Sequence, residues 1–103
     1  MKEVRVAAAS IEPGAAARVE GGPFGVCVVR VGDKFYALAD RCSHANVELS
    51  AGDVDPDEMT VECWKHGSAF SLLTGEPASL PATESVAVYL TRLDGDDVIV
   101  EVP

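Results

Sequence analysis

Two short motifs contain most of the cysteine and histidine residues of the chain. One residue separates Cys42 from His44, two separate Cys63 from His66, and eighteen lie between the motifs. Together they account for both histidines and two of the three cysteines. Thiolate sulfur and imidazole nitrogen are common ligands of zinc and iron centres. A cysteine and a histidine this close in sequence can reach one metal region, so the spacing predicts a centre held by two loops.

Three kinds of chemistry use such residues. A [2Fe–2S] unit needs two protein ligands on each iron, which four side chains can supply. Zinc also accepts two thiolates and two imidazoles, but zinc fingers usually pair cysteine with cysteine and histidine with histidine. A catalytic cysteine–histidine pair needs an orienting acid and a substrate pocket, and the sequence indicates neither. The pattern favours the iron–sulfur centre and leaves a structural zinc site as the alternative.

The sequence around the motifs resembles the Rieske-type ferredoxins, whose pattern is Cys-x-His, a spacer, and Cys-x-x-His. The likeness continues in residues 49–52 after the first motif, and in Ser68 and Phe70 after the second. Residues 80–82 resemble the proline-containing loop that covers the cluster in this family. The resemblance extends over essentially the whole chain.

The resemblance implies one Rieske-type [2Fe–2S] cluster per chain. Cys42 and Cys63 would bind one iron, and His44 and His66 the other. With two thiolates and two neutral imidazoles the oxidised centre has no net charge. Adding an electron to it therefore costs less than adding one to a centre with four thiolates. This arithmetic explains why Rieske potentials lie between about −150 and +300 mV.

Four further residues are expected around the cluster: Trp64, Ser68, Phe70 and Pro81. By the resemblance, Ser68 brings a hydroxyl near the cluster sulfurs. Phe70 stands where high-potential relatives have tyrosine, so one hydrogen bond that favours the reduced state is missing. We therefore expect a potential at the low end of the range.

The third cysteine, Cys27, lies in the apolar run 26–29 and is expected to be a small buried hydrophobic residue. An odd number of cysteines argues against a disulfide framework. No apolar stretch approaches the roughly 20 residues that span a bilayer, and no secretory signal is visible. We therefore expect a cytoplasmic protein that does not enter a membrane.

Charge excludes some partners. The chain has 17 acidic and 8 basic residues, for a net charge of −9. Nucleic acid and anionic membranes both require a basic surface, so neither is expected. An acidic surface favours either solubility alone or steering toward a basic protein, and the sequence leaves both open.

The elements that must position the motifs are short strands separated by turns. We expect strands at 4–8, 15–20, 25–31, 35–39, 58–63, 69–73, 85–93 and 97–102. The alanine-rich second segment is ambiguous with a helix. The pattern predicts one all-β domain over residues 1–103, an antiparallel sandwich or barrel. A small cluster-binding subdomain built from loops would occupy approximately 41–81.

The function implied by the resemblance is single-electron transfer, with no catalytic turnover by this chain alone. A reductase would supply the electron, and a terminal non-haem iron oxygenase would accept it. A ferredoxin of iron–sulfur cluster assembly or redox homeostasis is the main alternative. A structural zinc module is the third possibility.

Overall fold

The computed structural model describes residues 2–42, 47–65, 67–78 and 84–102. These residues form ten β-strands and two short 3₁₀ helices, and every strand pair is antiparallel. The predicted all-β antiparallel fold is therefore confirmed. The two 3₁₀ helices are η1 (Ala8–Ser10) and η2 (Leu49–Ala51). Among the described residues, no helix is long and apolar enough to cross a membrane.

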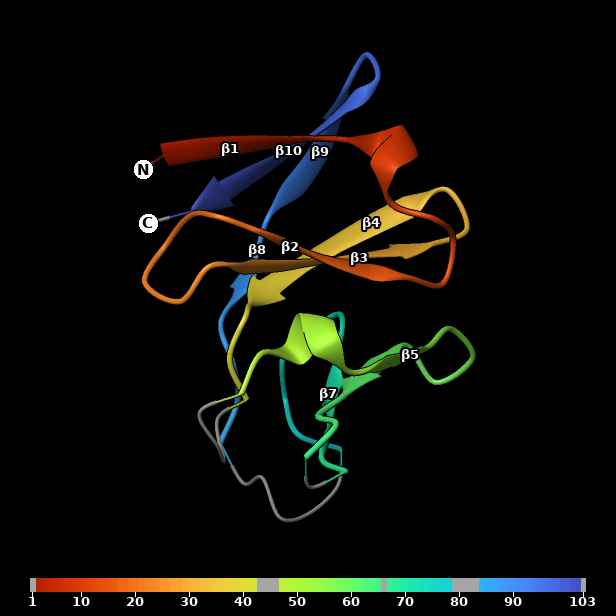
Figure 1. Cartoon of the computed structure of the whole chain (residues 1–103), viewed down its shortest axis with the longest axis vertical. Coiled ribbons are helices and arrows are strands. Elements are labelled where there is room, and N and C mark those ends of the chain that lie inside the picture. Colours follow the sequence, from red (N-terminus) through yellow and green to blue (C-terminus); the bar gives the residue numbers. More distant parts are fainter. Residues whose placement is uncertain (1, 43–46, 66, 79–83, 103) are drawn as a thin grey trace.

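The strands form three sheets arranged in tiers (Figure 1). The first sheet contains β1 (Lys2–Ala7), β10 (Asp97–Val102) and β9 (Thr91–Asp94), in that order. The second contains β2 (Ala16–Val19), β3 (Val26–Val31), β4 (Lys34–Ala39) and β8 (Val88–Tyr89). The third contains β5 (Asp53–Asp55), β6 (Thr60–Glu62) and β7 (Ala69–Ser71). The second sheet is the middle tier.

Strand β3 explains how one sheet serves two cores. Side chains alternate between the faces of a strand. Accordingly Cys27 and Val29 pack in a core with residues of the third sheet, while Val26 and Val28 pack with residues of the first. All four are fully buried. A continuous apolar run is the expected sequence of a strand covered on both faces.

The β3–β4 hairpin follows from its local sequence. Val31 pairs with Lys34, so Gly32 and Asp33 form a two-residue turn. Gly32 has φ of +60°, a conformation that glycine adopts at little cost. The hairpin sends β4 toward the first cysteine–histidine motif, which begins three residues after its end.

Two strand predictions differ from the structure. The segment 85–93, predicted as one strand, contains β8 and β9, which belong to different sheets. Leu90 lies between them and is largely exposed. The chain changes tier here because β8 pairs with β4 while β9 pairs with β10. Strand β5 lies in a stretch, residues 40–57, predicted from the sequence to be less regular. Two of its three residues are aspartates, which are depleted in strands.

Candidate metal centre

The two motif cysteines are buried in the same core. Cys42 follows β4, and Cys63 directly follows β6. Their exposed fractions are 1% and 0%, and both belong to the core between the second and third sheets. Leu49 and Phe70, fully buried, pack in this core as well. Two thiols from loops distant in sequence are thus held within one water-excluding environment.

Main-chain hydrogen bonds close both loops at their cysteines. The Cys42 N–H donates to the Val47 carbonyl oxygen at 2.9 Å. The Cys63 N–H donates to the Ser68 carbonyl at 2.6 Å, and the Cys63 carbonyl accepts from the Gly67 N–H at 2.9 Å. Gly67 has φ of +75°, which an L side chain rarely adopts, so glycine allows this turn.

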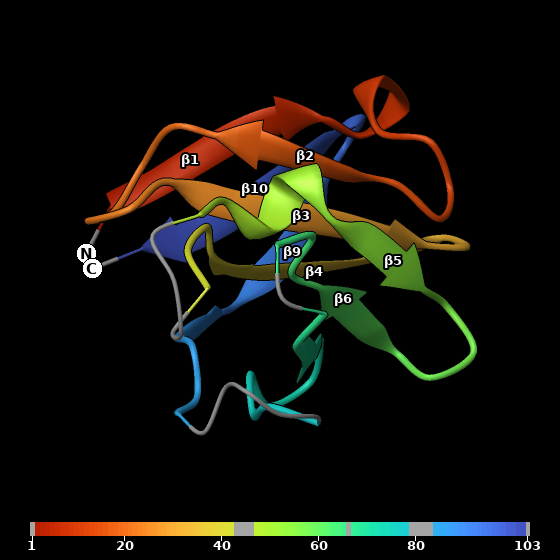
Figure 2. The same ribbon diagram turned by 60° about the horizontal axis from the view of Figure 1, so that its bottom comes forward.

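The two loops are joined through the third sheet. Asp53 of β5 pairs with Glu62 of β6, immediately before Cys63. Gly52 links η2 to β5, and a Cβ atom at this position would overlap the Glu62 carbonyl oxygen. The main chain after the first motif therefore lies directly against the main chain before the second. Figure 2 shows β5 and β6 in front of the middle sheet.

The residues expected around the cluster differ in burial. Ser68 and Phe70 are fully buried, whereas the Trp64 side chain is 59% exposed. Trp64 therefore presents most of its indole to solvent. His44, His66 and Pro81 lie outside the described residues. Among the described residues, no group of three or more histidine, cysteine, aspartate or glutamate side chains could hold a metal ion.

Cys27 is as buried as the two motif cysteines and packs in the same core. Burial, with a smaller contribution from the Asp40 carboxylate, raises the pKa of its thiol. Metals bind the thiolate, so a thiol held neutral in the middle of a strand is a poor ligand. The structure agrees with the interpretation of Cys27 as a core residue.

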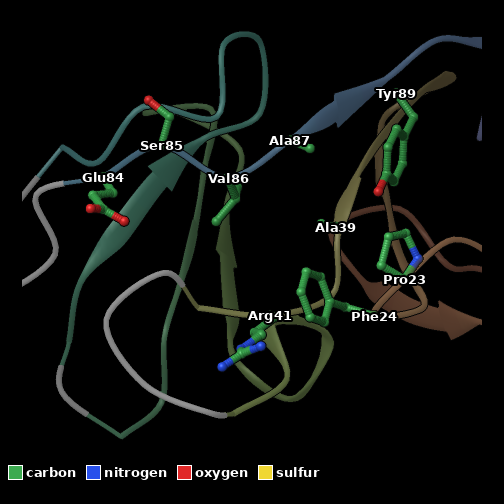
Figure 3. Close-up of a pocket in the computed structure, with 9 residues that line it drawn as sticks. All are labelled: Pro23, Phe24, Ala39, Arg41, Glu84, Ser85, Val86, Ala87 and Tyr89. Carbon is green, nitrogen blue, oxygen red and sulfur yellow. The ribbon is translucent and has the colours of Figure 1, made fainter. Parts of the chain in front are cut away.

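A pocket of about 370 Å³ opens beside the first motif (Figure 3). Arg41, which precedes Cys42, lines it, and its guanidinium carbon lies 4.8 Å from the centre of the Phe24 ring. Tyr89 forms part of the wall, and burial raises the pKa of its phenol. Among the described residues, the pocket is lined by neighbours of the first motif rather than by Cys42 or Cys63.

Sequence reasoning missed one feature of this region, the buried carboxylate of Asp40 two residues before Cys42. Asp40 is 2% exposed and accepts hydrogen bonds from Arg18 and Ser50. Aspartate is almost never buried without partners, but the sequence pattern contains no signal for partners 10 and 22 residues away.

Comparisons with known proteins agree with this site. The family model described as "Rieske [2Fe-2S] domain" matches residues 2–90. The 3-phenylpropionate/cinnamic acid dioxygenase ferredoxin subunit of Escherichia coli (strain K12) is 38% identical over 95 residues, covering 92% of this chain and 88% of that protein.

Solved structures agree with the sequence comparisons. The ferredoxin of carbazole 1,9a-dioxygenase from Nocardioides aromaticivorans IC177 superposes with a TM-score of 0.94, at 31% identity and full coverage of both chains. A second match comes from a complex of reduced oxygenase and oxidized ferredoxin in carbazole 1,9a-dioxygenase. It has a TM-score of 0.88 and 39% identity, covering 95% of this chain and 91% of that one.

The chain belongs to the family of Rieske [2Fe-2S] domains. Its cofactor is a Rieske-type [2Fe–2S] cluster rather than a structural zinc ion. It is a ferredoxin, an electron carrier and not itself a catalyst. The resemblance stated from the motifs is thereby confirmed.

Proposed function

We propose that this chain carries single electrons from a reductase to a terminal non-haem iron oxygenase, using one cluster bound by Cys42, His44, Cys63 and His66. The observation that carries the proposal is the burial of Cys42 and Cys63 in one core, each at the start of a loop that also holds a histidine in sequence. Similarity to dioxygenase ferredoxin subunits supports the oxygenase as acceptor over a role in cluster assembly.

The residues present fit a cluster of this kind. When bound, the cluster supplies a one-electron couple. The chain contributes two buried thiols, and Leu49 and Phe70 pack around them and exclude water. A dry site strengthens electrostatic interactions, so the ligand charges set the potential more strongly than they would in water. Closed main-chain loops at both cysteines limit rearrangement when the charge changes.

The proposal also covers the organisation of the chain. Residues 1–103 form one domain, and the cluster-binding subdomain occupies approximately 41–81. The third sheet, residues 53–71, falls within these bounds. Ser68, Phe70, Trp64 and Pro81 are proposed to surround the cluster. We place the protein in the cytoplasm, because an odd number of cysteines argues against a disulfide framework.

The test is an EPR spectrum of the dithionite-reduced protein, with iron and sulfide analysis. We expect two irons and two sulfides per chain and an anisotropic signal whose average g value lies below that of the free electron. Cys42→Ala, His44→Ala, Cys63→Ala and His66→Ala should each abolish the signal. Cys27→Ala is the matched control, because it removes an equally buried thiol and should leave signal and iron content unchanged.

Other results would reject specific parts of the proposal. An all-cysteine type of spectrum, or loss of the signal in Cys27→Ala but not in Cys42→Ala, would overturn the ligand assignment. The acceptor is tested separately, by reconstituting electron transfer with a purified reductase and an oxygenase encoded nearby. If the ferredoxin has a normal EPR spectrum but does not support oxygenase turnover in this reconstituted system, only the oxygenase role is rejected.

A further inference from the structure

Asp40 is the one charged residue that is buried among the residues the structure describes. Its side chain has no exposed surface. A buried carboxylate is unfavourable unless it is paired and hydrogen-bonded. Its partners therefore show which parts of the chain the carboxylate holds together.

Ser50 satisfies the Asp40 carboxylate from one side. The Ser50 N–H donates to Oδ1 at 2.7 Å, and the Ser50 hydroxyl donates to Oδ2 at 2.7 Å. Ser50 is the middle residue of η2. Asp40 and Ser50 thus join the two ends of the segment that contains Cys42 and His44. The Cys42–Val47 hydrogen bond lies within this larger ring.

Arg18 attaches the same carboxylate to the middle sheet. Its Nη1 atom lies 3.0 Å from Asp40 Oδ2 and also donates to the Phe24 carbonyl oxygen at 3.1 Å. Arg18 belongs to β2, and the Asp40 N–H donates to the Gly25 carbonyl oxygen at 3.1 Å. The segment just before the first motif is therefore linked to the middle sheet through both side chain and main chain.

The Arg18 guanidinium occupies space that requires glycine at position 25. A Cβ atom there would lie 2.7 Å from the guanidinium carbon. Gly25 also has φ of +81°, which disfavours other residues. Glu48 adds a further ion pair to Arg18, at 3.1 Å. The guanidinium is thus held by Asp40, Glu48 and the Phe24 carbonyl oxygen together.

We propose that Asp40 is a positioning residue for the cluster, holding the first ligand loop in one geometry by clamping Ser50 to Arg18. The inference rests on the proposed function, in which Cys42 and His44 are ligands. We call the contacts of Asp40 with Arg18 and Ser50 the clamp. Removing part of the clamp lets the ligand loop sample several arrangements while the sheets remain paired. The cluster is then released faster, and its EPR signal broadens because the ligand geometry is no longer uniform.

The competing explanation is that the clamp only stabilises the fold. Val100 provides the matched control, because it is fully buried in β10 and packs in the other core, between the first and second sheets. Val100→Ala weakens the fold without touching the ligand loop. If general stability were the whole effect, this variant would release iron as fast as clamp variants of equal stability.

The experiment uses cluster-loaded protein and the variants Asp40→Asn, Ser50→Ala, Ser50→Thr and Val100→Ala. Three quantities are measured for each: EPR linewidth, the rate of iron release to a chelator, and the urea midpoint of unfolding. We expect iron release to rise about tenfold in Asp40→Asn and about threefold in Ser50→Ala, with broadened signals. Ser50→Thr keeps the hydroxyl and should restore wild-type behaviour, and Val100→Ala should match wild type in linewidth and iron release.

Two results would overturn the inference. One is an unchanged linewidth and iron release in Ser50→Ala, which decides the matter even if Asp40→Asn does not fold. The other is equal release from Val100→Ala and the clamp variants at matched urea midpoints. The wild-type spectrum separates these failures from failure of the proposed function. If the wild type gives a normal Rieske signal but the Asp40 and Ser50 variants keep its linewidth and iron release, only the positioning role of Asp40 is rejected. If the wild type gives no Rieske signal, the proposed function is rejected as well.

Discussion

At the scale of single residues, we propose that Phe70 affects the reduction potential of the centre. Phe70 lies in β7, pairs with Val61 and is fully buried in the core that contains Cys42 and Cys63. A phenylalanine ring fills space and excludes water but donates no hydrogen bond. In the proposed site, the electron-rich reduced state would therefore have one hydrogen-bond donor fewer than with tyrosine at this position.

Phe70→Tyr should raise the midpoint potential by about 20–60 mV, the equivalent of one hydrogen bond worth about 0.5–1.5 kcal/mol in a one-electron couple. Protein-film voltammetry measures the shift. Phe35→Tyr is the control, since Phe35 lies in β4 and packs against the other core. An unchanged or lower potential in Phe70→Tyr would contradict the proposed place of this side chain.

At the scale of elements, the contact between η2–β5 and β6 holds the two motifs together. Gly52 has φ of −93°, an ordinary conformation for any residue, so glycine is not needed there for its backbone freedom. It is needed because a side chain would overlap the Glu62 carbonyl oxygen. The close approach of two main chains therefore helps to set the separation of the loops.

Gly52→Ala should separate β5 from β6 and destabilise the protein by about 2–3 kcal/mol or more, the usual cost of overpacking. Urea unfolding and iron content measure the two consequences. Gly32→Ala is the matched control: nothing lies within 4 Å of its Cβ position, and only its φ of +60° is unfavourable. It should cost about 1 kcal/mol and keep the cluster. Wild-type stability and iron content in Gly52→Ala would show that the two strands can move apart freely.

At the scale of the whole molecule, charge is distributed unevenly around the proposed centre. The net charge is −9, yet Arg41 and Lys65 stand beside Cys42 and Cys63. Both basic side chains are exposed. The net negative charge attracts cations to the molecule as a whole, whereas Arg41 and Lys65 attract anions to the surface near the motif cysteines. The ionic-strength dependence of electron exchange reports which of the two dominates.

We expect the overall charge to dominate for small reagents. Oxidation by a tris(phenanthroline)cobalt(III) cation should slow severalfold between about 10 and 200 mM salt, because screening shortens the Debye length from about 30 Å to below 10 Å. Oxidation by ferricyanide should accelerate over the same range. Stopped-flow absorbance measures both rates. The opposite salt dependence would mean that Arg41 and Lys65 control approach to the centre.

Local sequence was sufficient for part of this protein. The paired cysteine–histidine spacing indicated the centre because ligand spacing is a property of short segments. The β3–β4 hairpin was predictable because Gly32 and Asp33 form its turn with adjacent residues. Cys27 was recognisable as core because its neighbours are apolar and β-branched. The assignment of His44 and His66 as ligands stays a prediction.

Tertiary structure decided the features that depend on distant partners. Strand pairing breaks 85–93 at Leu90, since β4 and β10 lie in different sheets. The buried Asp40 carboxylate finds partners in β2 and η2, and Gly52 meets the main chain of β6. Propensity and periodicity describe a residue and its neighbours along the chain. These contacts exist only because folding brings separate segments together, and that is how Cys42 and Cys63 come to share one core.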